Sequence, residues 1–338
     1  FYECSNLTSV TIPEGVTSIG ASAFYECSNL TSVTIPEGVT SIGASAFYEC
    51  SGLTDVTIRE GATSIGERTF SGCSNLTSVT MPESVTSIGT WAFSGCTSLT
   101  SVTIPEGVTE IAGGAFYECT GLESVHLPEG LLSIAAHPDN YGYYAGAFEN
   151  CTSLKSVAIP ASVTSIGADA FYGCTSLTSV TISEGVTEIA GGAFYRCTSL
   201  ERVTLPEGLL EIEYYNIGGN NYGAFGNCTS LKSIVIPASV TSIGSYAFSG
   251  CSSLASVTIL EGVTSIGNYA FSYCSGLTSV TIPEGVTSIG GSAFISCTSL
   301  NNVAIPASVT SIGNYAFSYC SNLTDITFAH RGRDTLSI

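Results

Sequence analysis

The sequence predicts a parallel β-solenoid of about thirteen turns, each about 23 residues long. Fourteen cysteines mark the period, and eleven of the thirteen intervals between them are 23 residues. A fixed period of roughly 20 to 50 residues is typical of stacked-repeat architectures. The two longer intervals, Cys119–Cys151 and Cys197–Cys228, indicate insertions at about residues 135–146 and 213–223. We therefore expect one continuous repeat domain over residues 1–338.

Each turn is expected to open with a strand, as residues 27–49 illustrate. In that repeat Val33 and Ile35 alternate with polar residues, which is the two-residue period of a strand with one buried face. Pro36 follows, and because proline cannot donate to a parallel ladder, the strand should end there. Stacking the turns should align these strands in a curved parallel sheet.

The rest of the repeat predicts a short second strand and one tight turn. Val39 and Ile42 are spaced to face the core, and Gly43 allows the chain to turn after them. Phe47 then returns to the core, and the residues up to Cys50 are expected to form a single helical or 3₁₀ turn. Burial of each large apolar side chain contributes roughly 1.5–3 kcal/mol, so a repeat needs neighbours on both sides to be stable.

The fourteen cysteines are predicted to be buried free thiols. Equivalent positions in stacked turns point the same way about 4.8 Å apart, whereas a disulfide needs Cβ vectors that converge. A buried thiol packs as a small apolar group. Metal binding is not expected, since no Cys-x-x-Cys pair occurs and only three histidines are present. The sequence therefore predicts no cofactor.

Acidic residues outnumber basic ones by 27 to 8, which gives a formal charge of -19. Such a surface repels phosphate backbones and anionic lipid, so nucleic-acid binding is not expected. No apolar run approaches the roughly 18 residues that cross a bilayer, so direct membrane insertion is not expected either. The sequence also lacks GxxxxGK, HExxH and GxSxG motifs, and we predict no enzymatic activity and no catalytic residue.

The pattern LxxVxIPxxVxxIGxxAFxxC, as in Leu30 to Cys50, resembles the Treponema-type leucine-rich repeat of the BspA-like surface proteins. It recurs over residues 1 to about 328. The resemblance implies a leucine-rich-repeat solenoid and an extracellular or cell-surface location. It also implies adhesion to host matrix proteins or to other cells. No ligand motif is fixed in that family, so the resemblance supplies no site residues.

The two insertions are the candidate binding segments. Both lie between the second isoleucine and the Ala-Phe pair of their repeat, and both are rich in Tyr, Gly and Asn, as antibody loops are. Loops that only meet solvent are the alternative. Because the insertions are three repeats apart, their bases should be separated by roughly 14–15 Å on one flank, and we predict one bipartite site. The predicted ligand-binding residues are His137, Asp139, Asn140, Tyr141, Tyr143, Tyr144, Tyr214, Tyr215, Asn216, Asn220, Asn221 and Tyr222.

Two other surface features accompany the insertions. Aromatic residues replace serine just before several Ala-Phe pairs, on the flank from which the insertions emerge, where they can anchor a ligand or simply meet solvent. On the strand face we expect two exposed ion pairs, Glu123 with Lys155 and Glu201 with Lys232, because each pair occupies equivalent positions in adjacent repeats. The aromatic residues are Trp91, Tyr246, Tyr269 and Tyr315.

The sequence thus favours a non-catalytic binding module, an adhesin segment that recognises a protein or glycan at a cell surface or matrix. A structural spacer or assembly subunit that projects other domains is the alternative. Phe1 enters in mid-repeat, and the pattern decays after Cys320 without a polar cap. We therefore expect a piece of a longer protein, or a subunit that assembles end to end through its uncapped ends.

Overall fold

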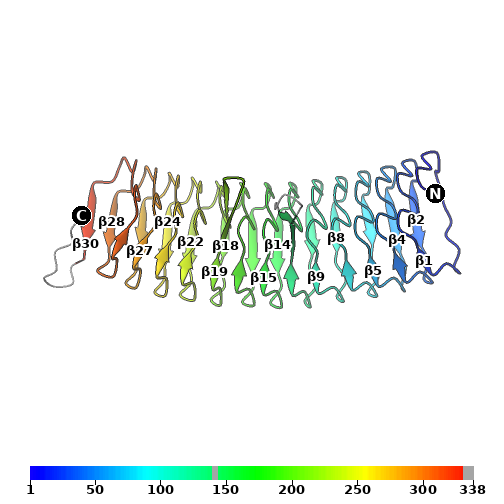
Figure 1. Ribbon diagram of the computed structural model, residues 1–338, viewed down its shortest axis with the longest axis horizontal. Helices are drawn as coiled ribbons and strands as arrows, with labels where there is room; N and C mark the ends of the chain where they lie inside the picture. The colour runs from blue at the N-terminus through cyan, green and yellow to red at the C-terminus, as the bar shows by residue number, and fades with distance from the viewer. Residues whose placement is uncertain (139–143, 330–338) are drawn as a thin grey trace.

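The computed structural model describes residues 1–138 and 144–329. The chain winds into an elongated parallel β-solenoid whose turns stack along the long axis, with the two termini at opposite ends (Figure 1). The array bows only slightly in this view. The predicted fold class is confirmed.

Each complete turn contains a first strand of three or four residues with one buried face. In β2 (Ser32–Ile35) Val33 and Ile35 are buried, and Pro36 directly follows the strand as predicted. The first strands pair in parallel and in register, so Val33 lies beside Val56, but they form four sheets of two to five strands and not the one continuous sheet expected from the sequence. The other first strands are β4 (Asp55–Ile58), β6 (Ser78–Thr80), β8 (Ser101–Thr103), β10 (Ser124–His126), β14 (Ser156–Ile159), β16 (Ser179–Ile182), β18 (Arg202–Thr204), β22 (Ser233–Ile236), β24 (Ser256–Ile259), β26 (Ser279–Thr281), β28 (Asn302–Ile305) and β30 (Asp325–Phe328).

The second strands have only two residues each, yet they join in one thirteen-stranded parallel sheet. Its register continues past both insertions, since β11 (Ser133–Ile134) pairs directly with β15 (Ser165–Ile166) and β19 (Glu211–Ile212) with β23 (Ser242–Ile243). The second-strand ladder is therefore continuous past both insertions, whereas the first-strand ladder is interrupted beside each of them, between β10 and β14 and between β18 and β22. The remaining strands of this sheet are β1 (Ser18–Ile19), β3 (Ser41–Ile42), β5 (Ser64–Ile65), β7 (Ser87–Ile88), β9 (Glu110–Ile111), β17 (Glu188–Ile189), β25 (Ser265–Ile266), β27 (Ser288–Ile289) and β29 (Ser311–Ile312).

The segment around each Ala-Phe pair differs from the helical or 3₁₀ turn expected from the sequence. It is a run of β-turns, and none of the described residues is helical. In the third turn the Tyr48 N–H donates to the Ser45 carbonyl at 3.1 Å, while the Phe47 N–H donates to Thr69 in the next repeat at 2.8 Å. A helix would direct its N–H groups along its own segment, whereas this alternation also bonds each turn to its neighbour. Stacking therefore decides the local conformation.

One hydrophobic core runs inside the array. Its phenylalanines stack in a column, with ring centroids 5.0 Å apart between Phe24 and Phe47 and 5.3 Å apart between Phe171 and Phe194. Such offset aromatic contacts add to the free energy that burial already supplies. The column gives every repeat the same packing environment.

The cysteines form a second column. Those from Cys27 to Cys320 are buried free thiols, as predicted, whereas Cys4 is exposed. The buried thiols donate to a phenylalanine carbonyl of the preceding repeat, as Cys73 does to Phe47 at 3.2 Å. Burial raises the pKa of the Cys73 thiol well above its usual value, so it stays protonated and unreactive.

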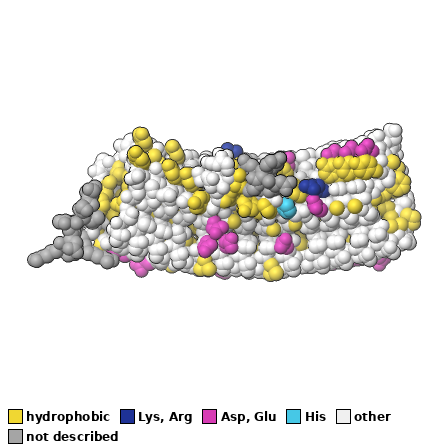
Figure 2. Space-filling model, viewed as in Figure 1, with side chains coloured by type: hydrophobic (Ala, Val, Ile, Leu, Met, Phe, Trp, Pro, Cys, Tyr) yellow, Lys and Arg dark blue, Asp and Glu magenta, His cyan; other side chains and the backbone are white. Residues whose placement is uncertain are grey.

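The surface of the array is sparsely charged. In Figure 2 most of the visible face is neither charged nor apolar, and the ionised side chains gather in a few small groups. Both predicted ion pairs form, with Nζ–Oε2 distances of 2.5 Å for Lys155–Glu123 and 2.6 Å for Lys232–Glu201. Across residues 1–138 and 144–329 there is no helix that could span a membrane.

Candidate binding cavity between two hairpins

Both insertions contain β-hairpins that project from the same flank. β12 (Ala136–Pro138) pairs antiparallel with β13 (Tyr144–Gly146), and β20 (Tyr214–Ile217) pairs antiparallel with β21 (Asn220–Gly223). The second hairpin closes at Gly218–Gly219, where both φ angles are positive, at 58° and 84°. Two positive φ angles are what a type I′ turn requires, and glycine adopts them without steric cost.

Paired glycines one repeat before each hairpin leave room for it. A Cβ at Gly191 would lie 2.6 Å from the Tyr215 backbone nitrogen, and a Cβ at Gly192 would lie 1.9 Å from Asp169 Oδ1. The equivalent pair, residues 113–114, makes the same room for the first hairpin and for the ring of Trp91. The Ala-Gly-Gly-Ala-Phe motif therefore precedes both insertions because a larger side chain at its glycines would clash with neighbouring atoms at each hairpin.

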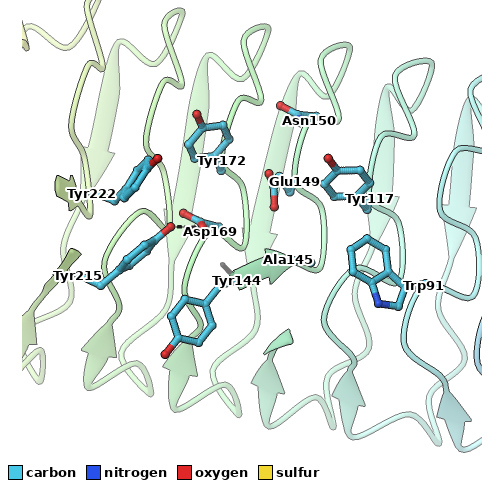
Figure 3. A pocket seen from close by; sticks show the side chains of 10 residues that line it. All are labelled: Trp91, Tyr117, Tyr144, Ala145, Glu149, Asn150, Asp169, Tyr172, Tyr215 and Tyr222. Carbon is cyan, nitrogen blue, oxygen red and sulfur yellow. Dashed lines mark hydrogen bonds between the residues drawn. The ribbon is translucent and has the colours of Figure 1, made fainter. Parts of the chain in front are cut away.

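A cavity of about 430 Å³ lies between the two hairpins. Its side chains extend from Trp91 at one end to Tyr222 at the other, with Glu149 and Asp169 between them (Figure 3). Six of the ten lining residues are aromatic, and none of the ten is basic. The lining residues are Trp91, Tyr117, Tyr144, Ala145, Glu149, Asn150, Asp169, Tyr172, Tyr215 and Tyr222.

Tyrosines close the gap between the hairpins. Tyr144 of the first hairpin meets Tyr215 of the second edge to face, with ring centroids 5.3 Å apart. Tyr215 stacks in turn on Tyr222 at 4.9 Å, and Tyr222 meets Tyr195 of the underlying repeat at 5.3 Å. The two insertions thus contribute to one wall, as the predicted bipartite arrangement requires.

Asp169 is the most deeply buried acid of the cavity, with 4% of its surface exposed. Its Oδ2 accepts a hydrogen bond from the Tyr215 hydroxyl, while its buried Oδ1 has no hydrogen-bond partner among the described residues. Burial raises the pKa of this carboxyl to about 7, and the Tyr215 hydrogen bond opposes the rise. A buried acceptor without a donor is costly, and it marks the place where a ligand could supply one.

Glu149 is the second acid of the cavity and is half-buried. Its Oε2 accepts a hydrogen bond from the Gly146 N–H at 3.1 Å. Burial, together with the neighbouring Asp169 and Glu118 charges, raises the pKa of the Glu149 carboxyl to about 8, and the Gly146 hydrogen bond opposes the rise. Together the two carboxyls make the cavity floor acidic, and both titrate near neutral pH.

The structure places the predicted binding residues in three environments. Tyr144, Tyr215 and Tyr222 line the cavity. Tyr214 lies outside it, with its ring 6.4 Å from that of Tyr246, and His137 is exposed on β12. Four predicted residues lie outside the described part of the chain, namely Asp139, Asn140, Tyr141 and Tyr143.

The asparagines of the second hairpin lie on its other side. Asn216 donates to Asn221 across the hairpin at 2.8 Å. Asn220 and Asn221 line a second hollow of about 510 Å³ together with Arg196. These asparagines therefore support the hairpin and do not line the tyrosine-lined cavity.

The sequence-based prediction missed both acids of the cavity. When the repeats are aligned, Asp169 occupies the position that is Trp91 or Tyr246 in other repeats. Glu149 occupies the position that is Tyr117 in the preceding repeat. Each is the only carboxylate in its column, so aligning the repeats by column would have singled them out. Also missing from the predicted set were Trp91, Tyr117, Asn150 and Tyr172.

Comparison with known proteins assigns the fold to a family. Residues 1–123, 143–217 and 216–333 match the BspA type leucine rich repeat region, in six copies. The chain belongs to the BspA-type leucine-rich repeat family. No curated protein matches this BspA-type chain.

Solved structures of three bacterial proteins resemble this BspA-type protein over most of its length. A leucine-rich repeat protein from Bacteroides ovatus is 34% identical with a TM-score of 0.70, and the match covers 95% of this chain and 87% of that one. A leucine rich cell surface protein from Faecalibacterium prausnitzii is 35% identical with a TM-score of 0.60, covering 96% and 89%. A leucine-rich repeat protein from Eubacterium ventriosum is 26% identical with a TM-score of 0.52, covering 87% and 83%.

Proposed function

We propose that the protein is a non-catalytic binding module of a bacterial cell surface, an adhesin segment that recognises a protein or glycan through the cavity between its hairpins. The observation that carries this proposal is the meeting of two separate insertions at one tyrosine-lined cavity. Tyrosine supplies rigid contact area that is apolar on its faces and polar at its hydroxyl, which suits recognition of either ligand class. The description of the Faecalibacterium relative as a cell surface protein supports the location.

A spacer is the second candidate, because the regular turns form a long uniform rod with few charged groups on the visible face (Figure 2). Binding and spacing make different demands on the hairpins. A binding module needs both hairpins, whereas a spacer needs only the number of stacked repeats.

Shortening the hairpins separates these two functions. Each insertion is reduced to the four residues that join Ile42 to Phe47 in a regular repeat, and each variant is probed on arrays of glycans and matrix proteins. Because the thirteen-stranded sheet bypasses both hairpins, the variants should fold. We expect either deletion to remove most of the capture seen with the intact chain. Unchanged capture by both deletion variants would contradict a binding role for this cavity.

A further inference from the structure

We propose that the cavity takes the ammonium or guanidinium group of a lysine or arginine side chain presented by a protein partner. This inference rests on the proposed function and names the ligand chemistry of the same site. It follows from the charge of the cavity, from its aromatic lining and from its unused hydrogen-bond acceptor.

The cavity contains two carboxyls and no basic counterpart. Asp169 and Glu149 both lie on its floor, and no lysine, arginine or histidine is among its described lining residues. Arg196 lies beyond Tyr172 and donates to the Tyr172 hydroxyl at 3.3 Å. Buried charges in proteins are normally paired, so a cation inside the cavity would form an ion pair with the ionised carboxyls.

The aromatic lining suits a cation as well. Six aromatic side chains line the cavity, with Trp91 and Tyr117 at one end and Tyr215 and Tyr222 at the other (Figure 3). The face of an aromatic ring attracts a cation, and indole attracts it most strongly. Rings above an acidic floor therefore favour an organic cation over a neutral sugar.

The free acceptor selects a cation that bears N–H groups. Asp169 is almost fully buried, and its Oδ1 has no hydrogen-bond partner within residues 1–138 and 144–329. An ammonium or guanidinium group can donate to the Asp169 and Glu149 carboxylates, whereas a quaternary ammonium has no hydrogen to donate. A metal ion is a poorer fit, because within the described ranges no three His, Cys, Asp or Glu side chains are grouped to hold one.

The dimensions of the site favour a side chain of a larger partner. A volume of about 430 Å³ falls within the range of small-ligand pockets and is far too small for a folded domain. Beside it, Tyr144 and Tyr214 are 37% and 46% exposed, so they can contact a partner surface beyond the cavity. The charge of -19 would also steer a basic partner toward the chain.

Affinity for such a cation should rise with pH. The carboxyls bind a cation only when ionised, and their pKa values of about 7 and 8 put that ionisation between pH 6 and pH 9. The hydroxyls of Tyr117, Tyr172 and Tyr215 have raised pKa values and stay protonated across that range. A lysine analogue stays charged there too, because its pKa is about 10.4. Among the other nearby groups, Glu118 acts on the Glu149 carboxyl, and Arg196 and Tyr222 act on Tyr172.

Trp91 makes the experiment specific, because it is the only tryptophan in the chain and it lines the cavity. Its fluorescence is titrated with Nα-acetyl-lysine amide and Nα-acetyl-arginine amide. The controls are Nα-acetyl-norleucine amide, whose side chain is uncharged, and Nα-acetyl-trimethyllysine amide, whose side-chain cation has no N–H group. We expect saturable changes with the first two, at least tenfold weaker binding of both controls, and at least tenfold tighter lysine binding at pH 9 than at pH 6. Calorimetry on the same samples confirms the binding stoichiometry.

Charge-removing variants locate the effect. Asp169→Asn and Glu149→Gln should each weaken lysine-amide binding at least tenfold, whereas Glu211→Gln, on the exposed side of β19, should not. Far-UV circular dichroism and melting curves establish that each variant is folded. Equal binding of the norleucine amide, or no loss in either folded cavity variant, would overturn the inference. If the hairpin deletions remove capture on the arrays while the amides give no saturable change in fluorescence, the proposed binding function stands. The proposal that the ligand is a lysine or arginine side chain would then be wrong.

Discussion

The regular turns and the two turns that carry hairpins share one frame but differ in what they place on the flank. In the regular N-terminal turns equal residues stack on equal residues, as Tyr25 does on Tyr48 with ring centroids 4.9 Å apart. Around the hairpins, Glu149 occupies the position equivalent to Tyr25 and Tyr48. Asp169 occupies the position equivalent to Ser22 and Ser45, and the flank becomes a cavity. Stacking of identical residues stabilises the rod, whereas the different residues at these positions near the hairpins form a concave polar surface.

The frame tolerates this difference because the hairpins satisfy their own backbone groups. β20 and β21 pair with each other, while the core ladder continues beneath them, with Phe194 N–H donating to the Ala224 carbonyl at 2.8 Å. Four substitutions test how the core, the surroundings of the cavity and the strand face each affect stability.

The largest effect should come from the phenylalanine column. Phe171→Ala removes a fully buried ring that stacks on Phe148 and Phe194, and it should lower the free energy of unfolding by roughly 3–5 kcal/mol. Because a repeat contacts only its neighbours, the array should then unfold in two steps in a denaturant titration. The matched control, Tyr214→Ala on the exposed hairpin, should change stability by less than about 0.5 kcal/mol. An unchanged midpoint for Phe171→Ala would contradict the packing described.

The second largest effect should be a dependence of the free energy of unfolding on pH, which arises from the buried carboxyls of the cavity. The folded pKa of Asp169 is about 7, above its unfolded value, so the folded state holds the extra proton and stability falls as pH rises. Between pH 5 and pH 8 Asp169 alone should lower the free energy of unfolding by about 3 kcal/mol, at 1.36 kcal/mol per pH unit up to pH 7. Melting temperatures across this range measure the dependence. Asp169→Asn should make the profile less steep and leave the share that comes from Glu149, whose pKa is also raised, and an equally steep profile in that variant would assign the Asp169 share elsewhere.

Two glycines near the hairpins, Gly192 and Gly219, allow a sharper comparison. Gly192 and Gly219 both have positive φ, so alanine is strained at either position by about 1–2 kcal/mol. Only at Gly192 would the new Cβ also meet Asp169 Oδ1, since nothing lies within 4 Å of a Cβ at Gly219. We expect Gly192→Ala to cost about 2 kcal/mol more than Gly219→Ala in denaturant unfolding. Equal costs would show that the carboxylate is free to move aside.

The smallest effect should come from the strand face. Lys155→Met breaks the pair with Glu123, whose side chains are both well exposed, so the free energy of unfolding should fall by less than about 1 kcal/mol. The loss should shrink further in high salt, because exposed pairs are screened. A salt-independent loss would indicate that packing of the lysine stem, and not its charge, matters here.

The sequence alone determined the frame of this protein, because a repeat that is copied every 23 residues must bury the same positions in every turn. The strand at Val33 and Ile35, its end at Pro36 and the buried thiol column all follow from the spacing of apolar residues within one repeat. The turn around Phe47 did not follow, because its N–H groups bond both within the turn and to the next repeat, and the second partner exists only after stacking.

The cavity, too, was predictable from the sequence only in part. Its place, between two tyrosine-rich insertions three repeats apart, was predictable from the sequence, and so was the participation of Tyr144, Tyr215 and Tyr222. The acidic floor was decided by tertiary structure: Asp169 and Glu149 come from two adjacent turns, and only the packing of the hairpins over them excludes water and raises their pKa values. Sequence spacing fixes which side chains face the core, whereas the burial of a charge depends on every neighbour that covers it.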